Sequence, residues 1–197
     1  STPTLDELRK LSVDEIASLK KLDMRSYNLV TPVKDQGAQG ICWAYAFAAS
    51  SEVNMLYKNV LDGKYNNQNF GLSSKKIDTT VNIRNADTDV LRLTEKDTFS
   101  RQLGNGAISL FHNAQIMMQQ NADIVNENPN SLTGEKAAWL QSIINIQNDV
   151  QEIKRTIAKY GAVAFAYKSS NYTSYYATRS SFDHAATIVG WDDDYDK

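Results

Sequence analysis

The chain has 197 residues, of which 42% are hydrophobic and 10% are aromatic. This is enough apolar material for one domain or two small lobes, and it excludes a mainly disordered chain. The formal net charge of −2 excludes the broad basic surface that binds nucleic acid or an anionic membrane. No apolar run has the length of a membrane span. The N-terminal residues show no apolar stretch of a secretory signal, so a signal peptide, if one existed, is expected to have been removed.

Two helix-start patterns lie in the first 24 residues. Thr4 and Glu7 have the spacing of a capping box, and Ser12 and Glu15 repeat it. Leucine and isoleucine residues follow at helical spacing. Residues 1–24 are therefore predicted to form a short helical hairpin or a docked arm.

The only cysteine of the chain, Cys42, follows a loop that contains Gly37 and Gly40. The run 43–57 after it has neither Gly nor Pro and is apolar on several faces, which predicts a largely buried helix. Unpaired N–H groups and the positive end of the helix dipole favour the thiolate form of a cysteine in a first turn. Cys42 is thus placed to act as a nucleophile.

The middle of the chain carries further helix patterns. We expect a short helix after a Ser cap within 71–77, a packed helix over 108–119 and an amphipathic helix over 135–146. Another helix should begin near Asp149 and stop at Gly161. An apolar strand over 162–167 follows directly.

Near the end of the chain, His184 precedes a second apolar strand that closes with Gly190 and Trp191. The four aspartates at 192–194 and 196 come next. They are predicted to form a solvated loop, with a calcium site as a weaker alternative, because carboxylates alone do not make a coordination cage.

Two of these strings resemble one protein family. Gln36-Gly-x-x-Gly40-x-Cys42-Trp-Ala, preceded by Pro-Val-Lys-Asp, is similar to the active-site segment of papain-like cysteine proteases. Asp183-His184-Ala, followed by Val-Gly-Trp, is similar to the family's histidine segment. The resemblance implies an α+β fold of two lobes, in which a helical lobe with the nucleophile helix faces a β-barrel-like lobe across a cleft.

The resemblance also implies a division of the chain. Residues 25–120 would form the helical lobe with Cys42, and residues 121–197 the β-rich lobe with His184. The segment 121–134 would be the crossover between them. Residues 1–24 would be either a remnant of the family's inhibitory pro-segment or a linker that packs ahead of the catalytic domain.

Roles for individual residues follow from the same resemblance. Cys42 would attack a peptide carbonyl, His184 would act as acid and base, and the Gln36 amide would bind the oxyanion with the Cys42 N–H. Peptide substrate would contact Trp43, Gly106, Ala107 and Asp183. No cofactor and no metal ion is implied.

The family's third catalytic residue is an asparagine some 15 to 30 residues after the histidine, but Lys197 follows His184 by only thirteen. We therefore expect the C-terminal part of the β-rich lobe to be missing from this chain. This C-terminal part would lie in a second chain produced by proteolytic nicking, in a disordered segment or in residues outside the given sequence. A C-terminal fragment that carries the asparagine is then an expected partner, besides substrate and the pro-segment.

A single cysteine excludes an intramolecular disulfide, and this favours a bacterial member over a eukaryotic secreted or lysosomal one. Secretion or display on the bacterial surface is expected, and a cytoplasmic location also fits. The leading function is that of an endopeptidase. The alternatives are a transpeptidase or exopeptidase on the same scaffold, and a catalytically silent module that binds peptides or joins a surface assembly.

Overall fold

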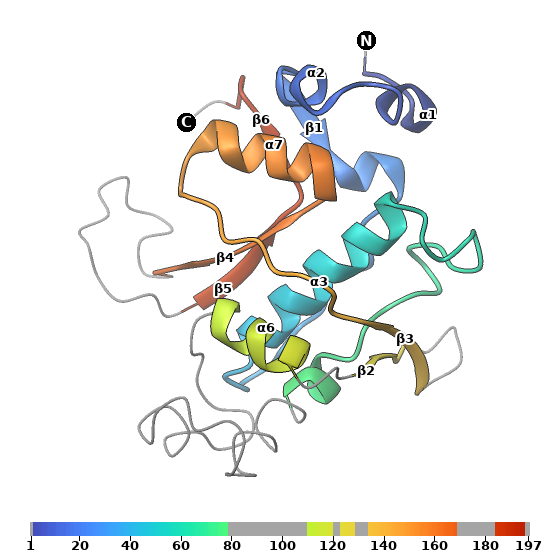
Figure 1. The fold of residues 1–197 in the computed structure, drawn as a ribbon, viewed down its shortest axis with the longest axis vertical. Coiled ribbons are helices and arrows are strands. Elements are labelled where there is room, and N and C mark those ends of the chain that lie inside the picture. The colour runs from blue at the N-terminus through green and yellow to red at the C-terminus, as the bar shows by residue number, and fades with distance from the viewer. Residues whose placement is uncertain (1, 79–109, 120–122, 129–133, 169–183, 196–197) are drawn as a thin grey trace.

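The computed structural model describes residues 2–78, 110–119, 123–128, 134–168 and 184–195. Helices and strands are interspersed along the chain (Figure 1). In chain order they are α1 (Leu5–Leu8), α2 (Val13–Ala17), β1 (Lys21–Asp23), a 3-10 helix (Met24–Tyr27), α3 (Cys42–Tyr57), α6 (Leu110–Gln119), β2 (Asp123–Asn126), β3 (Glu135–Trp139), α7 (Val150–Tyr160), β4 (Val163–Tyr167), β5 (His184–Ile188) and β6 (Gly190–Asp192). The described strands pair antiparallel as β1–β6, β2–β3 and β4–β5.

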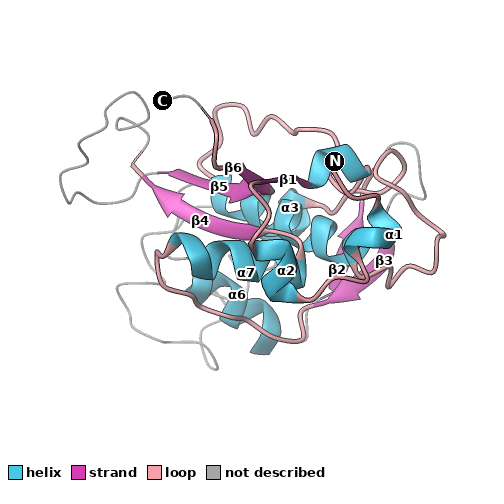
Figure 2. Ribbon diagram, turned by 90° about the horizontal axis from the view of Figure 1, so that it is seen from above, coloured by secondary structure: helices cyan, strands magenta, loops and turns pink. Residues whose placement is uncertain are grey.

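Helix α3 runs through the middle of the molecule, as Figures 1 and 2 show from two directions. It is buried on several faces, with Trp43 at 1% exposure and Val53 at 1%. Strands β4 and β5 and helix α6 all contact it. The predicted buried helix over 43–57 is confirmed, because a helix that is apolar all round must lie in a core.

Both predicted capping boxes at the N-terminus are present. The side chains of Thr4 and Ser12 accept from the backbone N–H groups of Glu7 and Glu15, whose carboxylates accept in return. The helices that they start are short, and α2 packs against α7. Because α2 contributes the buried Ile16 to the main core, the arm is docked.

Strand β1 continues the arm into a sheet with β6. Leu22 lies opposite Trp191 and Asp23 opposite Gly190. A Cβ atom at Gly190 would lie 2.1 Å from the carbonyl oxygen of Leu22, so this close approach requires glycine. The indole N–H of Trp191 also donates to the carbonyl of Leu19 at 2.8 Å.

Helix α7 begins and ends where its sequence predicts. The carboxylate of Asp149 accepts from the N–H of Glu152 at 2.9 Å. Gly161 ends the helix with a φ of 103°, a conformation that residues with a side chain rarely adopt. Strand β4 follows at once, so the predicted helix, glycine and strand are confirmed.

The helix predicted over 135–146 is wrong. Residues 135–139 form β3, in which Glu135 pairs with Asn126 of β2 and Trp139 pairs with Asp123. The strand β2 itself lies in the segment 121–134, for which the sequence predicts a crossover between the two lobes and no strand. Pairing between strands therefore overrides the helical periodicity, and Ile144 on the expected apolar face is 52% exposed.

Asp193 and Asp194 lie exposed in a turn, as predicted for a solvated loop, but the aspartates at 192–194 also form ion pairs. Asp192 ends β6 and pairs with Lys21 at 2.7 Å. Asp193 accepts from Lys154 of α7 through both oxygens, at 2.6 and 2.7 Å, and the Lys154 side chain is only 6% exposed. Opposite charge, which sequence spacing does not reveal, fixes this segment onto α7 and β1.

Candidate active site

Cys42 is the first residue of α3 and is 6% exposed. The residue before it, Ile41, makes no side-chain capping hydrogen bond, so no cap of this kind occupies the first-turn N–H groups. These groups and the helix dipole stabilise negative charge at this end of the helix. The thiol therefore lies at the end of α3 whose backbone N–H groups could receive an oxyanion.

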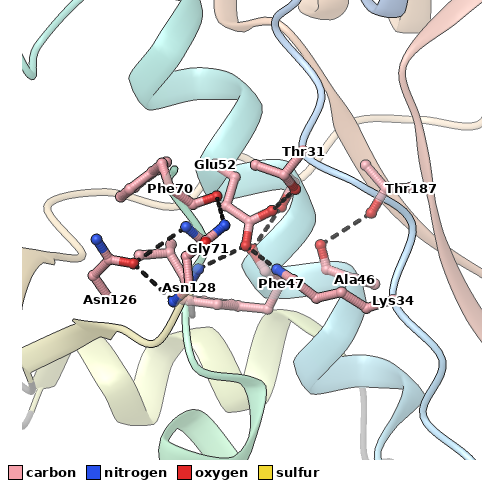
Figure 3. A network of polar contacts seen from close by, with 12 residues as sticks. Thr31, Lys34, Ala46, Phe47, Glu52, Phe70, Gly71, Asn126, Asn128 and Thr187 are labelled. Carbon is pink, nitrogen blue, oxygen red and sulfur yellow. Dashed lines mark hydrogen bonds and ion pairs between the residues drawn. The ribbon is translucent and has the colours of Figure 1, made fainter. Parts of the chain in front are cut away.

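The segment that leads into Cys42 is held by hydrogen bonds to Glu52, a residue of α3 that is 1% exposed. Its carboxylate accepts hydrogen bonds from the hydroxyl of Thr31, the ammonium of Lys34 and the N–H of Leu72 (Figure 3). The bond from Leu72 is 2.7 Å long. A buried charge with several donors fixes its partners firmly, so Glu52 anchors the start of the loop that carries Gln36.

Gln36 itself lies within this loop and is half-buried. Its side-chain amide donates to the carbonyl of Gln39 at 2.7 Å. The amide is thus engaged within its own loop, by a residue that lies three positions before Cys42. One rotation of the side chain away from Gln39 would release the donor.

His184 is the first residue of β5, and β5 packs along α3. The register between the two is fixed by Thr187, whose hydroxyl donates to the carbonyl of Ala46 at 3.0 Å. Cys42 precedes that contact by about 6 Å of helix, and His184 precedes it by about 10 Å of strand. The first ends of α3 and β5 lie on the same side of the molecule (Figure 1), so Cys42 and His184 belong to neighbouring ends of two packed elements.

The imidazole of His184 does not bond to the thiol in this structure. Among the described residues, no hydrogen bond links Cys42 and His184, and the ring contact of His184 is with Tyr167, at 5.4 Å between ring centroids. Catalytic hydrogen bonds are often formed only when substrate binds. The structure therefore brings the two elements together without a hydrogen bond between these two side chains.

The residues expected to contact substrate are placed less completely. Trp43 as a whole is 1% exposed, so the structure buries both its side chain and its backbone. Gly106, Ala107 and Asp183 lie outside the residues that the structure describes.

A cavity of about 580 Å³ lies beside the loop that precedes Cys42. Pro32, Lys34, Tyr45, Leu72 and Asn128 are among its lining residues, whereas Cys42 and His184 are not. The cavity therefore adjoins the candidate site without forming it, and its mixed charges favour no particular ligand.

Sequence reasoning missed Glu52, Thr187 and Tyr167. A signal was available for Glu52, because it is the one charged residue in an otherwise uncharged run from Trp43 to Tyr57, and such a residue in a core needs partners. The other two carry no local signal. Their roles depend on the pairing of β4 with β5 and on the packing of β5 against α3.

Neither a metal-binding cluster nor a membrane-spanning helix is found in the part of the chain that the structure describes. Within the described ranges, no group of three or more His, Cys, Asp or Glu side chains could hold a metal ion. No helix in the same part of the chain is long and apolar enough to cross a membrane.

Comparisons with known proteins point to one family. Residues 19–197 match the family model described as papain family cysteine protease. The chain is 24% identical to cysteine proteinase 2 of Dictyostelium discoideum over 92% of its own length and 48% of that protein. A stretch that covers 25% of the chain is 40% identical to peptidase 1 of Euroglyphus maynei, over 16% of that protein.

A solved structure gives the same fold. The digestive procathepsin L 3 of Tenebrio molitor larval midgut matches with a TM-score of 0.58 and 16% identity, over 94% of this chain and 58% of that one. The chain spans about half the length of the first of these relatives. The expected α+β papain-like fold is confirmed, and the family model covers most of the chain. The chain belongs to the papain family of cysteine proteases.

Proposed function

We propose that the protein is a cysteine endopeptidase with Cys42 as its nucleophile and His184 as its acid and base. The observation that carries this proposal is the joint placement of the two residues. Cys42 begins the buried helix α3, His184 begins β5, and the bond from Thr187 to Ala46 holds the two elements in register. A nucleophile and a base on adjoining rigid elements are what covalent catalysis requires.

The reaction would take two steps. The thiolate of Cys42 attacks the peptide carbonyl, the C–N bond breaks, and the imidazolium of His184 gives its proton to the leaving amine. Water then loses a proton to His184 and attacks the thioester, which releases the acid product and regenerates the thiol.

Gln36 would assist both steps through the oxyanion. Its amide would leave Gln39 and donate, with the N–H of Cys42, to the developing negative charge. Loss of one such donor lowers kcat about 100-fold to 1,000-fold. Gln36→Ala should therefore lower kcat by this factor.

Peptide or protein substrates and a pro-segment are further parts of the proposal. A solved structure with this fold is a proenzyme, which supports the pro-segment. We assign the helical lobe to residues 25–120 and the β-rich lobe to residues 121–197. Residues 1–24 are a packed arm or a pro-segment remnant, and the docking of α2 on α7 favours the packed arm.

The proposed location is outside a bacterial cell or on its surface. The support for it is that Cys42 is unpaired and is the one cysteine of the chain. Secreted eukaryotic members of this size rely on disulfides for stability.

A transpeptidase, which transfers the acyl group to an amine, and an exopeptidase, which trims a peptide from one end, would use the same chemistry. Both are alternatives to the endopeptidase.

A catalytically silent module is the second candidate function. It is favoured by the absence of a hydrogen bond between Cys42 and His184 within the described residues. Such a protein would bind peptides through the same cleft without cleaving them.

Labelling with a thiol-directed epoxide, followed by intact mass measurement of the full-length protein, separates the two. One adduct on the wild type and none on Cys42→Ala is expected. His184→Gln should slow labelling strongly, whereas His112→Gln, at the other histidine of the chain, should not. No adduct on a folded wild type with reduced Cys42 would overturn the peptidase and favour the silent module.

A further inference from the structure

The imidazole of His184 lies against one aromatic side chain of the neighbouring strand. Tyr167 is its direct cross-strand partner in the β4–β5 pair. The two ring centroids are 5.4 Å apart and the ring planes meet at 65°. This is the edge-to-face geometry that aromatic pairs prefer.

The ring of Tyr167 also contacts a second aromatic side chain, that of Phe165. Phe165 lies two residues earlier on β4, therefore on the same face of the sheet. Its ring stacks on that of Tyr167, with centroids 5.2 Å apart and 22° between the planes. The three rings of Phe165, Tyr167 and His184 thus form one continuous row.

The row lies on the face of the sheet that is turned away from α3. Thr187 bonds to α3 and Ala185 is 6% exposed, so these residues mark the face that packs on the helix. Strand alternation puts His184 on the other face, at the open end of the strand.

Hydrogen bonding does not fix the orientation of the His184 imidazole. Among the described residues, none bonds to a ring nitrogen of His184, and the ring of Tyr167 is the aromatic side chain that contacts its imidazole. We propose that Tyr167 is a positioning residue for His184, because this ring contact restricts the orientations from which the imidazole approaches Cys42. This inference rests on the proposed peptidase function.

The expected effect is moderate, since aromatic pairs bias an orientation rather than fix it. Tyr167→Leu should lower kcat about threefold to tenfold, with KM changed less than twofold, because the contact concerns the imidazole and not the substrate. Tyr167→Phe keeps the ring and should keep kcat within about twofold of the wild type. Tyr195→Leu makes the same chemical change at a side chain that is 76% exposed, and it should have no effect.

Nuclear magnetic resonance tests the contact without reference to activity. In the full-length protein, the ring signals of His184 are identified as those lost in His184→Gln. The neighbouring aromatic rings should shift them by ring currents. Tyr167→Leu should abolish this shift, whereas Tyr167→Phe and Tyr195→Leu should retain it.

The outcomes separate the two ideas. A shift that depends on Tyr167, together with a fall in kcat that Tyr167→Phe rescues, supports the positioning role. Unchanged kcat in Tyr167→Leu, or a rise in kcat, overturns that role even if the peptidase is real. A wild type with no Cys42-dependent activity overturns the proposed function, and with it the positioning role, whatever the shifts show.

Discussion

The backbone N–H of Leu72 donates to the Oε1 atom of Glu52 across 2.7 Å. The same carboxylate accepts from Thr31 and Lys34, so a single buried residue of α3 joins two separate segments. Glu52→Gln should lower the free energy of unfolding by about 2–4 kcal/mol, because the amide brings no charge and presents N–H groups to donors. Urea unfolding followed by circular dichroism measures this loss.

A double-mutant cycle with Lys34→Met tests the origin of the effect. The coupling between Glu52 and Lys34 should exceed about 1 kcal/mol. Lys64→Met, which breaks an ion pair to Glu135 whose lysine is 61% exposed, is the matched control and should cost under about 1 kcal/mol. Additive effects of Glu52→Gln and Lys34→Met would contradict the shared network.

Thr187→Val removes the hydroxyl that ties β5 to α3 and keeps the shape of the side chain. We expect a loss of about 1 kcal/mol in stability and a fall in kcat, since His184 and Cys42 lose their common register. Thr156→Val is the matched control, because its hydroxyl bonds to the carbonyl of Glu152 within α7 at 2.7 Å. Equal kcat values for the two variants would argue against a role of Thr187 in register.

Gly190→Ala should disrupt the pairing of β1 with β6. The added methyl group would lie 2.1 Å from the carbonyl oxygen of Leu22, a backbone atom that cannot move aside alone. We expect a destabilisation above about 3 kcal/mol, at the upper end for overpacking. Hydrogen exchange of the β1 and β6 amides reports the disruption, and unchanged protection there would refute it.

Stability should fall with acid through the carboxylates that are paired in the folded protein. The hydrogen bond from Lys21 lowers the pKa of Asp192, and that from Arg25 lowers the pKa of Asp23. A folded-state pKa below the unfolded value of about 3.9 contributes stability above that pH. This contribution is lost as the pH falls through the folded pKa.

Asp192→Asn isolates one of these groups. Its urea midpoint should lie below that of the wild type at pH 7, and the difference should shrink as the pH falls below the unfolded value of about 3.9 and through the lowered pKa of Asp192 in the folded wild type. Lys21→Met should behave in the same way, because it removes the other partner. A difference that stays constant from pH 7 to pH 3 would refute the linkage.

The sequence predicted best those elements whose signals are local. The capping boxes at Thr4 and Ser12, the buried helix after Cys42 and the stop at Gly161 each depend on residues a few positions apart. The helix expected over 135–146 failed because β3 is set by its partner β2, and pairing over a distance leaves no mark in a short window.

The residues of the candidate site also divide into those with a local sequence signal and those placed by pairing between distant segments. Cys42 and His184 could be proposed from their strings, because a nucleophile and a base impose strict local surroundings. Tyr167 could not, since only the register of β4 against β5 puts it opposite His184. The pairing of Asp193 with the buried Lys154 was likewise invisible, because the two residues belong to different elements.

The pairing of Lys21 with Asp192 spans 171 residues, and this has a consequence for the order in which the protein folds. Contacts between such distant positions form slowly, because a long loop must close before they can add stability. During synthesis β6 is made only after the whole stretch that separates it from β1. The edge of β1 therefore stays unpaired by β6 while that stretch is made, and its closure with β6 should come late in the folding of this domain.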